Sequence, residues 1–243
     1  TVADATVSAS ELNTIAAATT IPVILDSDGT SGDAITSIES SAYADVLALF
    51  QNASAFTGLS SSPVIVSDSI TVAQANALDA LTAGAITATI SDQALSTLLG
   101  LTGTGNVYAT TVQDTTAAAA DLNTLVSKIN KANGVNIAAT GTITGSLADL
   151  NTLYVTNGAT INNEGDEAIT VSDTSVDADL LTTLNTETTG DITIDATNIF
   201  GQADNIVALY DANANSGSTD QISGLDGAET LTITGDSGSL TVI

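Results

Sequence analysis

The sharpest candidate for chemistry is a short acidic segment near the N-terminus, Asp26-Ser27-Asp28-Gly29, which is followed by Asp33. Calcium takes six to eight oxygen ligands, and alternating carboxylates in a loop that bends at glycine can direct several oxygens inward together. The spacing therefore predicts a calcium site formed by Asp26, Asp28 and Asp33. The alternative interpretation is a solvated acidic turn between two repeats.

A second candidate calcium loop lies near the C-terminus. Asp211, Asn213 and Asn215 alternate with alanine after an expected helix over 203–210, and Asp220 follows. The pattern begins like an EF-hand loop. However, the glycine comes one position late, and Ile222 stands where an EF-hand has its bidentate glutamate. We therefore expect a looser calcium loop or a plain linker here.

Two further groups of polar residues are candidates for binding a cation or ice. A dense acidic stretch would be stabilised by a cation, although a solvated face is the simpler interpretation; it contains Glu164, Asp166, Glu167, Asp173, Asp177 and Asp179. Thr-x-Thr pairs recur along the chain, as at Thr87/Thr89 and Thr140/Thr142/Thr144. A flat ladder of such pairs could bind ice, but threonine is also a good residue for the exposed face of a strand.

The composition offers little for catalysis. Histidine and cysteine are absent, so a serine nucleophile would lack its usual base. A pair of carboxylates could hydrolyse glycosides, but four Tyr, three Phe and no Trp leave few platforms for stacking sugars. A polysaccharide lyase would need cations to neutralise its acidic substrate, and the chain has only two lysines. We therefore expect a protein that is not an enzyme.

The charge balance excludes whole classes of partner. The chain has 28 acidic residues against Lys128 and Lys131, which gives a net charge of −26. Nucleic-acid binding depends on Lys and Arg, and an anionic membrane surface would repel this chain. Salt shortens the Debye length to roughly 3–10 Å, so an extracellular, cation-containing setting suits such acidity. Because 43% of residues are hydrophobic, the chain should fold rather than stay disordered.

An internal repeat organises the chain. The string Ala-Asp-Leu-Asn-Thr-Leu occurs at 120–125 and again at 148–153, and looser copies occur elsewhere. Ser8 with Glu11, Thr71 with Gln74 and Ser146 with Asp149 have the spacing of helix capping boxes. Aligned on the second residue of the motif, the copies fall at Glu11, Asp45, Asn76, Ala94, Asp121, Asp149, Asp179 and Asp204.

Strand-like runs alternate with these short helices. They alternate Ile or Val with Thr, which is the period-two pattern of a half-buried strand; the clearest are 63–66, 85–90, 135–137, 168–171, 191–194, 231–233 and 240–243. Strands that alternate with helices favour parallel pairing, and helices this short need neighbours to be stable. We therefore predict an α/β repeat, an elongated parallel solenoid-like stack over 1–200, with a repeat and a strand-rich segment over 201–243.

The C-terminal segment carries a family resemblance. Ile222-Ser223-Gly224-Leu225 and Glu229-Thr230-Leu231-Thr232-Ile233-Thr234-Gly235 resemble strings found in bacterial S-layer and type-I-secreted surface proteins, although Asp226-Gly227-Ala228 is inserted between them. The repeats as a whole are similar to those of very large secreted proteins, notably from marine cyanobacteria. The resemblance implies an extracellular, repetitive, often calcium-dependent surface protein, and it implies no catalytic residues.

These observations predict a structural role. The chain begins within a repeat and stops on an apolar strand, and an open strand edge is a template for pairing with another chain. We expect a homopolymer formed through the terminal repeats, or continuation into a longer parent protein. The product would be a surface layer, filament or matrix, without nucleic acid or membrane insertion. The alternative is an adhesin or a carbohydrate- or ice-binding module that contacts cell-surface polysaccharide.

Overall fold

A computed structural model describes residues 6–25, 37–129, 134–137, 141–162, 167–215, 222–225 and 229–234, with the side chains of 162 and 211–215 excepted. The fold is mixed α/β with parallel sheets, as the sequence predicts. The chain forms two compact units: Thr1–Thr111 with Ser127–Val135, and Val112–Val126 with Asn136–Ile243. The sequence boundary expected near residue 200 lies inside the second unit. None of the helices that the described residues form is both long enough and apolar enough to cross a bilayer.

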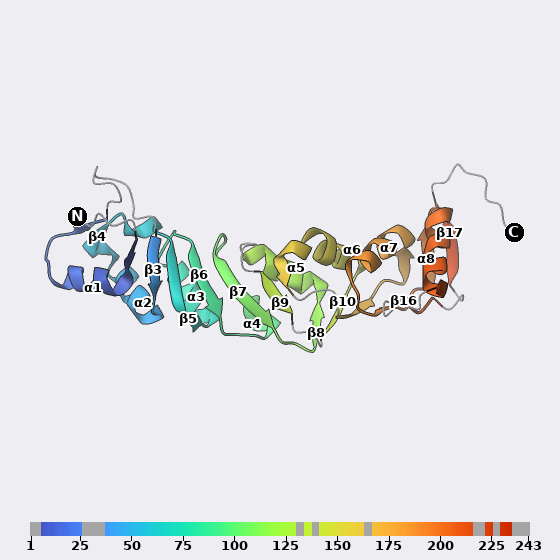
Figure 1. Ribbon diagram of the computed structural model, residues 1–243, viewed down its shortest axis with the longest axis horizontal. Coiled ribbons are helices and arrows are strands. Elements are labelled where there is room, and N and C mark those ends of the chain that lie inside the picture. The colour runs from blue at the N-terminus through green and yellow to red at the C-terminus, as the bar shows by residue number, and fades with distance from the viewer. Residues whose placement is uncertain are drawn as a thin grey trace. The chain divides into compact units, whose positions relative to one another are not determined.

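The first unit repeats one pattern, a strand followed closely by a short helix (Figure 1). Its strands are β1 (Thr6–Ser8), β2 (Val23–Ile24), β3 (Ser37–Ser41), β4 (Phe56–Thr57), β5 (Val64–Ile70), β6 (Ile86–Ile90) and β7 (Val107–Val112). Its helices are α1 (Ala9–Ala17), α2 (Tyr43–Gln51), α3 (Val72–Asp79) and α4 (Leu95–Leu98), with 3-10 turns at Ala53–Ala55 and Leu59–Ser61.

Sequence order is also spatial order in the sheet of this unit. Strands β1, β3, β5, β6 and β7 are neighbours in that order, and every pair with a described register is parallel. The buried residues Val7, Ile38, Val64 and Ile86 stand in register across four of these strands. A small separate pair, β2 with β4, is also parallel.

The second unit continues the strand-and-helix pattern. Its strands are β8 (Thr116–Ala118), β10 (Thr142–Gly145), β11 (Ile161–Asn162), β12 (Ala168–Val171), β13 (Ser175–Asp177), β14 (Ile192–Ile194), β15 (Asn198–Gly201), β16 (Ile222–Ser223) and β17 (Thr230–Ile233). Its helices are α6 (Leu147–Asn151), which runs on into a π-helical turn (Thr152–Thr156) and a 3-10 turn (Gly158–Thr160), α7 (Ala178–Glu187) and α8 (Ala203–Asn215). Strand β7, helix α5 (Ala119–Lys128) and strand β9 (Val135–Ile137) each contain residues of both units.

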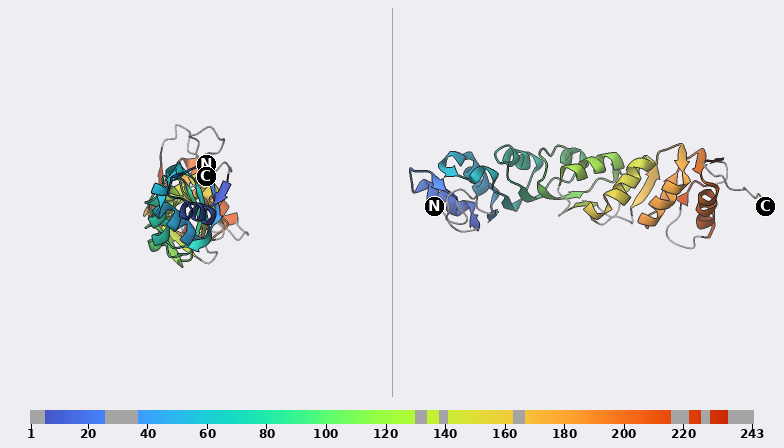
Figure 2. Two further views of the ribbon diagram at one scale, coloured as in Figure 1. Left: turned by 90° about the vertical axis from the view of Figure 1, so that its left-hand side faces the viewer. Right: turned by 90° about the horizontal axis from the view of Figure 1, so that it is seen from above.

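Two parallel sheets organise the second unit. One has the order β8, β10, β12, β14 and β16, and the other has the order β13, β15 and β17. In the larger sheet Ile143, Ile169, Ile192 and Ile222 stand in register and are all buried. Figure 2 shows the same progression by colour, with elements close in sequence lying next to each other within the unit. Period-two alternation therefore places one face of each strand in the core.

The helices share one frame when they are aligned on the residue that precedes each of them. These cap residues are Ser8, Ala42, Thr71, Ala94, Ala118, Ser146, Asp177 and Gln202, and successive caps are 34, 29, 23, 24, 28, 31 and 25 residues apart. The fourth residue after the cap is buried in every copy: Leu12, Val46, Ala75, Leu98, Leu122, Leu150, Leu181 and Ile206. A common apolar face thus fixes each helix against its sheet.

The structure corrects the sequence alignment of four copies. Asn76 occupies the fifth position after its cap rather than the third, and Ala94 is itself a cap residue. Asp179 and Asp204 stand at the second position. The burial of the fourth residue decides the frame, because the polar residue of the motif is free to vary while the core contact is not.

Candidate functional site

The two predicted calcium loops differ in how far the structure describes them. Asp26, Asp28, Asp33 and Asp220 lie outside the described residues. Helix α8 continues to Asn215, so the expected end of this helix at Tyr210 is wrong. The backbone of Asp211, Asn213 and Asn215 is helical, which differs from the loop of an EF-hand. The side chains of these three residues are outside the described part of the chain.

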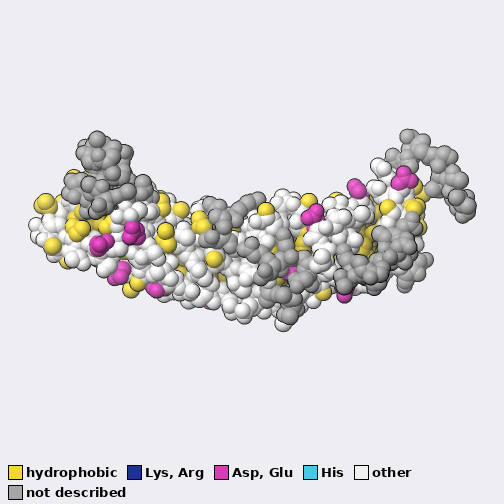
Figure 3. All heavy atoms as spheres, in the orientation of Figure 1, with side chains coloured by type: hydrophobic (Ala, Val, Ile, Leu, Met, Phe, Trp, Pro, Cys, Tyr) yellow, Lys and Arg dark blue, Asp and Glu magenta, His cyan; other side chains and the backbone are white. Residues whose placement is uncertain are grey.

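Within the described residues, no three acidic side chains gather closely enough to hold a metal ion. The face shown in Figure 3 carries its acidic side chains singly or in small groups, separated by uncharged surface. The acidic stretch near residue 170 is divided in the same way. Asp177 caps its own helix through Asp179 N at 2.9 Å, whereas Asp173 caps a different helix. Glu167 is buried, and Glu164 and Asp166 lie outside the described residues.

Several polar side chains cap the helix of the repeat that precedes them. The first N–H of a helix has no partner within that helix. Ser41 Oγ accepts the bond from Ala9 N at 3.0 Å, and the same role falls to carboxylates elsewhere. Asp68 accepts from Tyr43 N at 2.8 Å, Asp92 from Val72 N at 2.7 Å, and Asp173 from Leu147 N at 2.5 Å. These carboxylates therefore join consecutive repeats.

Asparagine at the fifth position forms a second set of links between repeats. Asn13 Nδ2 donates to Asp45 O at 2.9 Å, and Asn123 Nδ2 donates to Asp149 O at 2.9 Å. Asn76 makes two such bonds, donating to Gly100 O and accepting from Thr102 N, both at 2.8 Å. In each case the amide reaches backbone atoms of the next repeat, so the Asn of the motif has a structural use.

Helix capping explains why an acid or amide occupies the third position after the cap. Complete capping boxes form at Ser8 with Glu11 and at Thr71 with Gln74. The Glu11 carboxylate accepts from Ser8 N at 3.1 Å and from Ser8 Oγ at 2.7 Å. These hydrogen bonds, from the Ser8 side chain first and then from its backbone, lower the pKa of Glu11. A general acid needs a raised pKa at neutral pH, so Glu11 is suited to capping and not to donating a proton.

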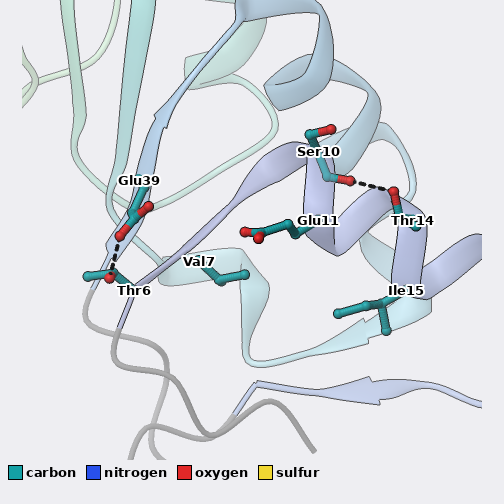
Figure 4. A pocket seen from close by; sticks show the side chains of 7 residues that line it. All are labelled: Thr6, Val7, Ser10, Glu11, Thr14, Ile15 and Glu39. Atoms are coloured by element: carbon teal, nitrogen blue, oxygen red, sulfur yellow. Dashed lines mark hydrogen bonds between the residues drawn. The ribbon is translucent and has the colours of Figure 1, made fainter.

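A groove of about 510 Å³ opens beside α1 and β1 in the first unit (Figure 4). In Figure 4 Glu11 and Ile15 project from α1 toward the side on which Val7 of β1 lies. Glu39 of β3 reaches the same groove and accepts from Thr6 Oγ1 at 2.6 Å. The two carboxylates thus each have a hydroxyl partner, and the remaining lining is hydroxyl and aliphatic.

A smaller groove of about 290 Å³ lies over the end of α3. Asp79 Oδ1 accepts from Asn106 Nδ2 at 2.8 Å, and the buried Asn106 accepts from Ile86 N at 2.9 Å. Gly103 has a φ of +79°, and a Cβ there would lie 2.2 Å from Asp79 Oδ1, so glycine is required. Burial, and secondarily the charge of Asp79, raises the pKa of the enclosed Tyr108. The arrangement fixes a loop and keeps Tyr108 neutral.

A ladder of hydroxyl groups crosses the larger sheet of the second unit. Thr144, Thr170, Thr193 and Ser223 stand in register on four adjacent strands. They lie on the partly or fully exposed face, opposite the buried isoleucines, and Ser223 Oγ donates to Thr193 Oγ1 at 3.1 Å. The sequence signal, Thr alternating with Ile, indicates the exposed positions but not their alignment across strands.

The lysine in the described part of the chain also has a structural partner. Lys128, in the last turn of α5, donates from Nζ to Leu101 O at 2.9 Å, within the first unit. Its position near a helix C-terminus is electrostatically favourable. Lys131 lies outside the described residues.

Comparison of the chain with protein-family models, with curated proteins and with solved structures gives no significant match.

Proposed function

We propose that this chain is a structural repeat protein, a building block of an extracellular layer, filament or matrix on a bacterial cell surface. In this proposal the repeats stack as one elongated α/β solenoid and the terminal repeats join copies of the chain. The proposed setting is extracellular because salt or cations would screen a net charge of −26. Neither nucleic acid nor membrane insertion has a part in the proposed role.

The observation that carries this proposal is the use of polar groups as links between repeats. Asp68, Asp92 and Asp173 each cap the helix of the preceding repeat. Asn13 and Asn123 each bind the backbone of the following repeat. Side chains that could do chemistry are thus engaged in joining one repeat to the next. A repeat whose neighbours complete its hydrogen bonding is suited to extended arrays.

Two solution measurements test this proposal. A compact globule of this length would have a radius of gyration of about 18 Å. Small-angle scattering should give a clearly larger value for the monomer if the repeats form one stack. Light scattering coupled to size exclusion should show larger species as the concentration rises. A compact particle that stays monomeric at high concentration and high salt would contradict the proposed role.

Calcium is proposed as a stabilising ion, on the support of sequence spacing alone. The proposed ligands are the side chains of Asp26, Asp28 and Asp33, because the helical backbone at 211–215 does not form the second predicted loop. Because an ion that binds only the folded chain stabilises it by mass action, the melting temperature should be higher with calcium than with a chelator. A double variant, Asp26→Asn with Asp28→Asn, should lose part of the difference, and Asp195→Asn serves as the control. Equal melting temperatures in both conditions would remove calcium from the proposal.

The hydroxyl ladder favours one alternative function, an adhesin or a carbohydrate- or ice-binding module. Thr144, Thr170, Thr193 and Ser223 present aligned hydroxyls on adjacent strands, which lie roughly 4.8 Å apart in a sheet. Such a row could bind a regular surface of hydroxyls. Ice-recrystallisation and glycan-binding assays on the native chain and on Thr193→Lys test this alternative. Loss of binding in the variant would support it, and no binding by the native chain would exclude it.

A further inference from the structure

The repeat frame provides a comparison between the first copy and all the others. The seventh residue after the cap is Leu49, Leu78, Leu101, Leu125, Leu153, Leu184 or Leu209 in the later copies, and its exposed fraction there is 0–1%. In the first copy the same position is Ile15, which is 37% exposed and lines the groove of Figure 4. The groove therefore exposes a position of the repeat that is buried in every later copy.

The adjoining strand is open in the same way. Among the described residues β1 pairs only with β3, so its other edge has no strand partner in this part of the chain. In the first unit the next strands, β3, β5 and β6, each have parallel neighbours on both sides. An unpaired edge presents backbone N–H and C=O groups to an incoming strand. The open edge of β1 and the uncovered Ile15 belong to the same face, which we call the front face.

Apolar residues are also uncovered in the last described repeats. The fifth residue after the cap is partly buried in the first seven copies, but in α8 it is Val207, with an exposed fraction of 57%. Strand β17 is the outer strand of its sheet among the described residues, and its Leu231 is 52% exposed. The residues in register with Leu231 on β15 and β13, Ile199 and Val176, are fully buried. Val207 and Leu231 define the rear face.

We propose that the front face of one copy of the chain receives the rear face of a second copy. This inference rests on the proposed function, and it names the surfaces and the partner. The second copy would cover Ile15 as the later repeats cover their leucines, and it would add a parallel strand to the free edge of β1. The contact repeats the packing that already joins consecutive repeats inside each unit.

The charges of the two faces favour this occupant. The front groove contains the carboxylates of Glu11 and Glu39, which would repel an acidic polysaccharide. The rear face offers the uncharged Val207 and Leu231, with Thr230 and Thr232 beside them on β17. Because the contact is heterologous, front to rear, it does not close as a symmetric dimer, and further copies add to it as a ring or a filament.

The test uses three variants of the full chain. The front variant is Ile15→Asp, and the rear variant is Val207→Asp with Leu231→Asp. The matched control is Val155→Asp with Leu180→Asp, which adds charge at exposed apolar residues of inner repeats. Sedimentation velocity at high salt, over a series of concentrations, measures the association of each chain alone and of the front and rear variants mixed. Circular dichroism checks that each variant is folded.

The native chain and the control should form species larger than a dimer. The front and rear variants alone should each lose association by about 30-fold or more, as for a central residue of an interface. Their equimolar mixture should form a dimer and nothing larger, since only one intact front and one intact rear face can meet. Native assembly that the front and rear variants leave intact would overturn this inference but leave the proposed function standing. A native chain that never assembles would overturn both.

Discussion

The Asn123 side-chain amide donates a hydrogen bond to the carbonyl oxygen of Asp149, one repeat further along the chain, with an N–O distance of 2.9 Å. Asn13 makes the corresponding bond to Asp45 at the same distance. The intervals of 26 and 32 residues differ, yet the donor and the acceptor occupy the same two positions of the repeat. The bond therefore sets the register between helices and tolerates a variable length of the connection.

Replacing Asn76 by alanine should remove both of its bonds to the next repeat, at Gly100 O and Thr102 N. Because the site is partly exposed, water can replace some of the lost interaction. We expect the free energy of unfolding to fall by about 1 kcal/mol, measured by urea denaturation. The exposed Gln93→Ala should change it by less than about 0.5 kcal/mol. Equal effects of the two variants would show that the Asn76 bonds do not hold the repeats together.

Asp92→Ala should leave the first N–H of α3, at Val72, without its carboxylate acceptor. Loss of a helix cap costs about 0.5–2 kcal/mol, and this should appear as a lower midpoint of thermal unfolding. Asp92→Asn keeps an acceptor oxygen and should recover most of the stability. If the asparagine variant were as unstable as the alanine variant, the charge of Asp92 would matter more than its hydrogen bond.

The lowered pKa of Glu11 predicts how the stability of the fold depends on pH. Its bonds from Ser8 lower its pKa in the folded chain below the ordinary value of 4.5. A carboxyl with a lowered pKa stabilises the fold above its unfolded pKa, and this stabilisation is lost as the pH falls through the folded pKa. Glu11→Gln keeps the acceptor of the capping box and removes the charge.

At neutral pH the native chain should therefore have a higher melting temperature than Glu11→Gln. This difference in melting temperature should disappear as the pH falls below 4.5. Comparing the two chains cancels the effect of acid on all the other carboxylates. A difference that stayed constant or grew in acid would contradict the assigned role of the Glu11 charge.

Tyr108→Phe tests a buried hydroxyl. The Tyr108 side chain is 1% exposed, and within the described part of the chain its hydroxyl is buried without a hydrogen-bond partner. Removing an unsatisfied hydroxyl should leave stability unchanged or raise it by about 1 kcal/mol. Burial raises the pKa of Tyr108 above its ordinary value of 10.0. The native chain should therefore lose stability as the pH rises above 10.0, and the variant should lose less. A marked destabilisation at neutral pH would show that the hydroxyl has a bound partner such as water.

Local patterns predicted much of the secondary structure. The strands β9 and β12 have the predicted bounds, and the capping boxes at Ser8 and Thr71 form as expected. Parallel pairing also follows from the alternation of strands with helices, and it is confirmed. These features depend on residues within a few positions of each other, and such short-range patterns can be read from the sequence.

The links between repeats could not be predicted in this way. Asp92 and Val72 are 20 residues apart, and Asp173 and Leu147 are 26 apart. Nothing in the local spacing distinguishes these aspartates from carboxylates that could bind calcium. The polar residue of the motif places Asn76 at the wrong position, whereas burial of Ala75 and Leu78 fixes the frame. The spacing of the capping box could have given the correct alignment.

The carboxylates that cap a helix from the following repeat give the chain a direction. A truncation that removes Asp92 from the C-terminal side leaves α3 without the acceptor for Val72 N. Removal of α3 from the N-terminal side, in contrast, leaves only an aspartate without its helix. Synthesis on the ribosome proceeds toward the C-terminus, so each such helix emerges one repeat before its cap. Growth of the folded part should therefore trail elongation by one repeat, and fraying should start at the C-terminal boundary of any shortened chain.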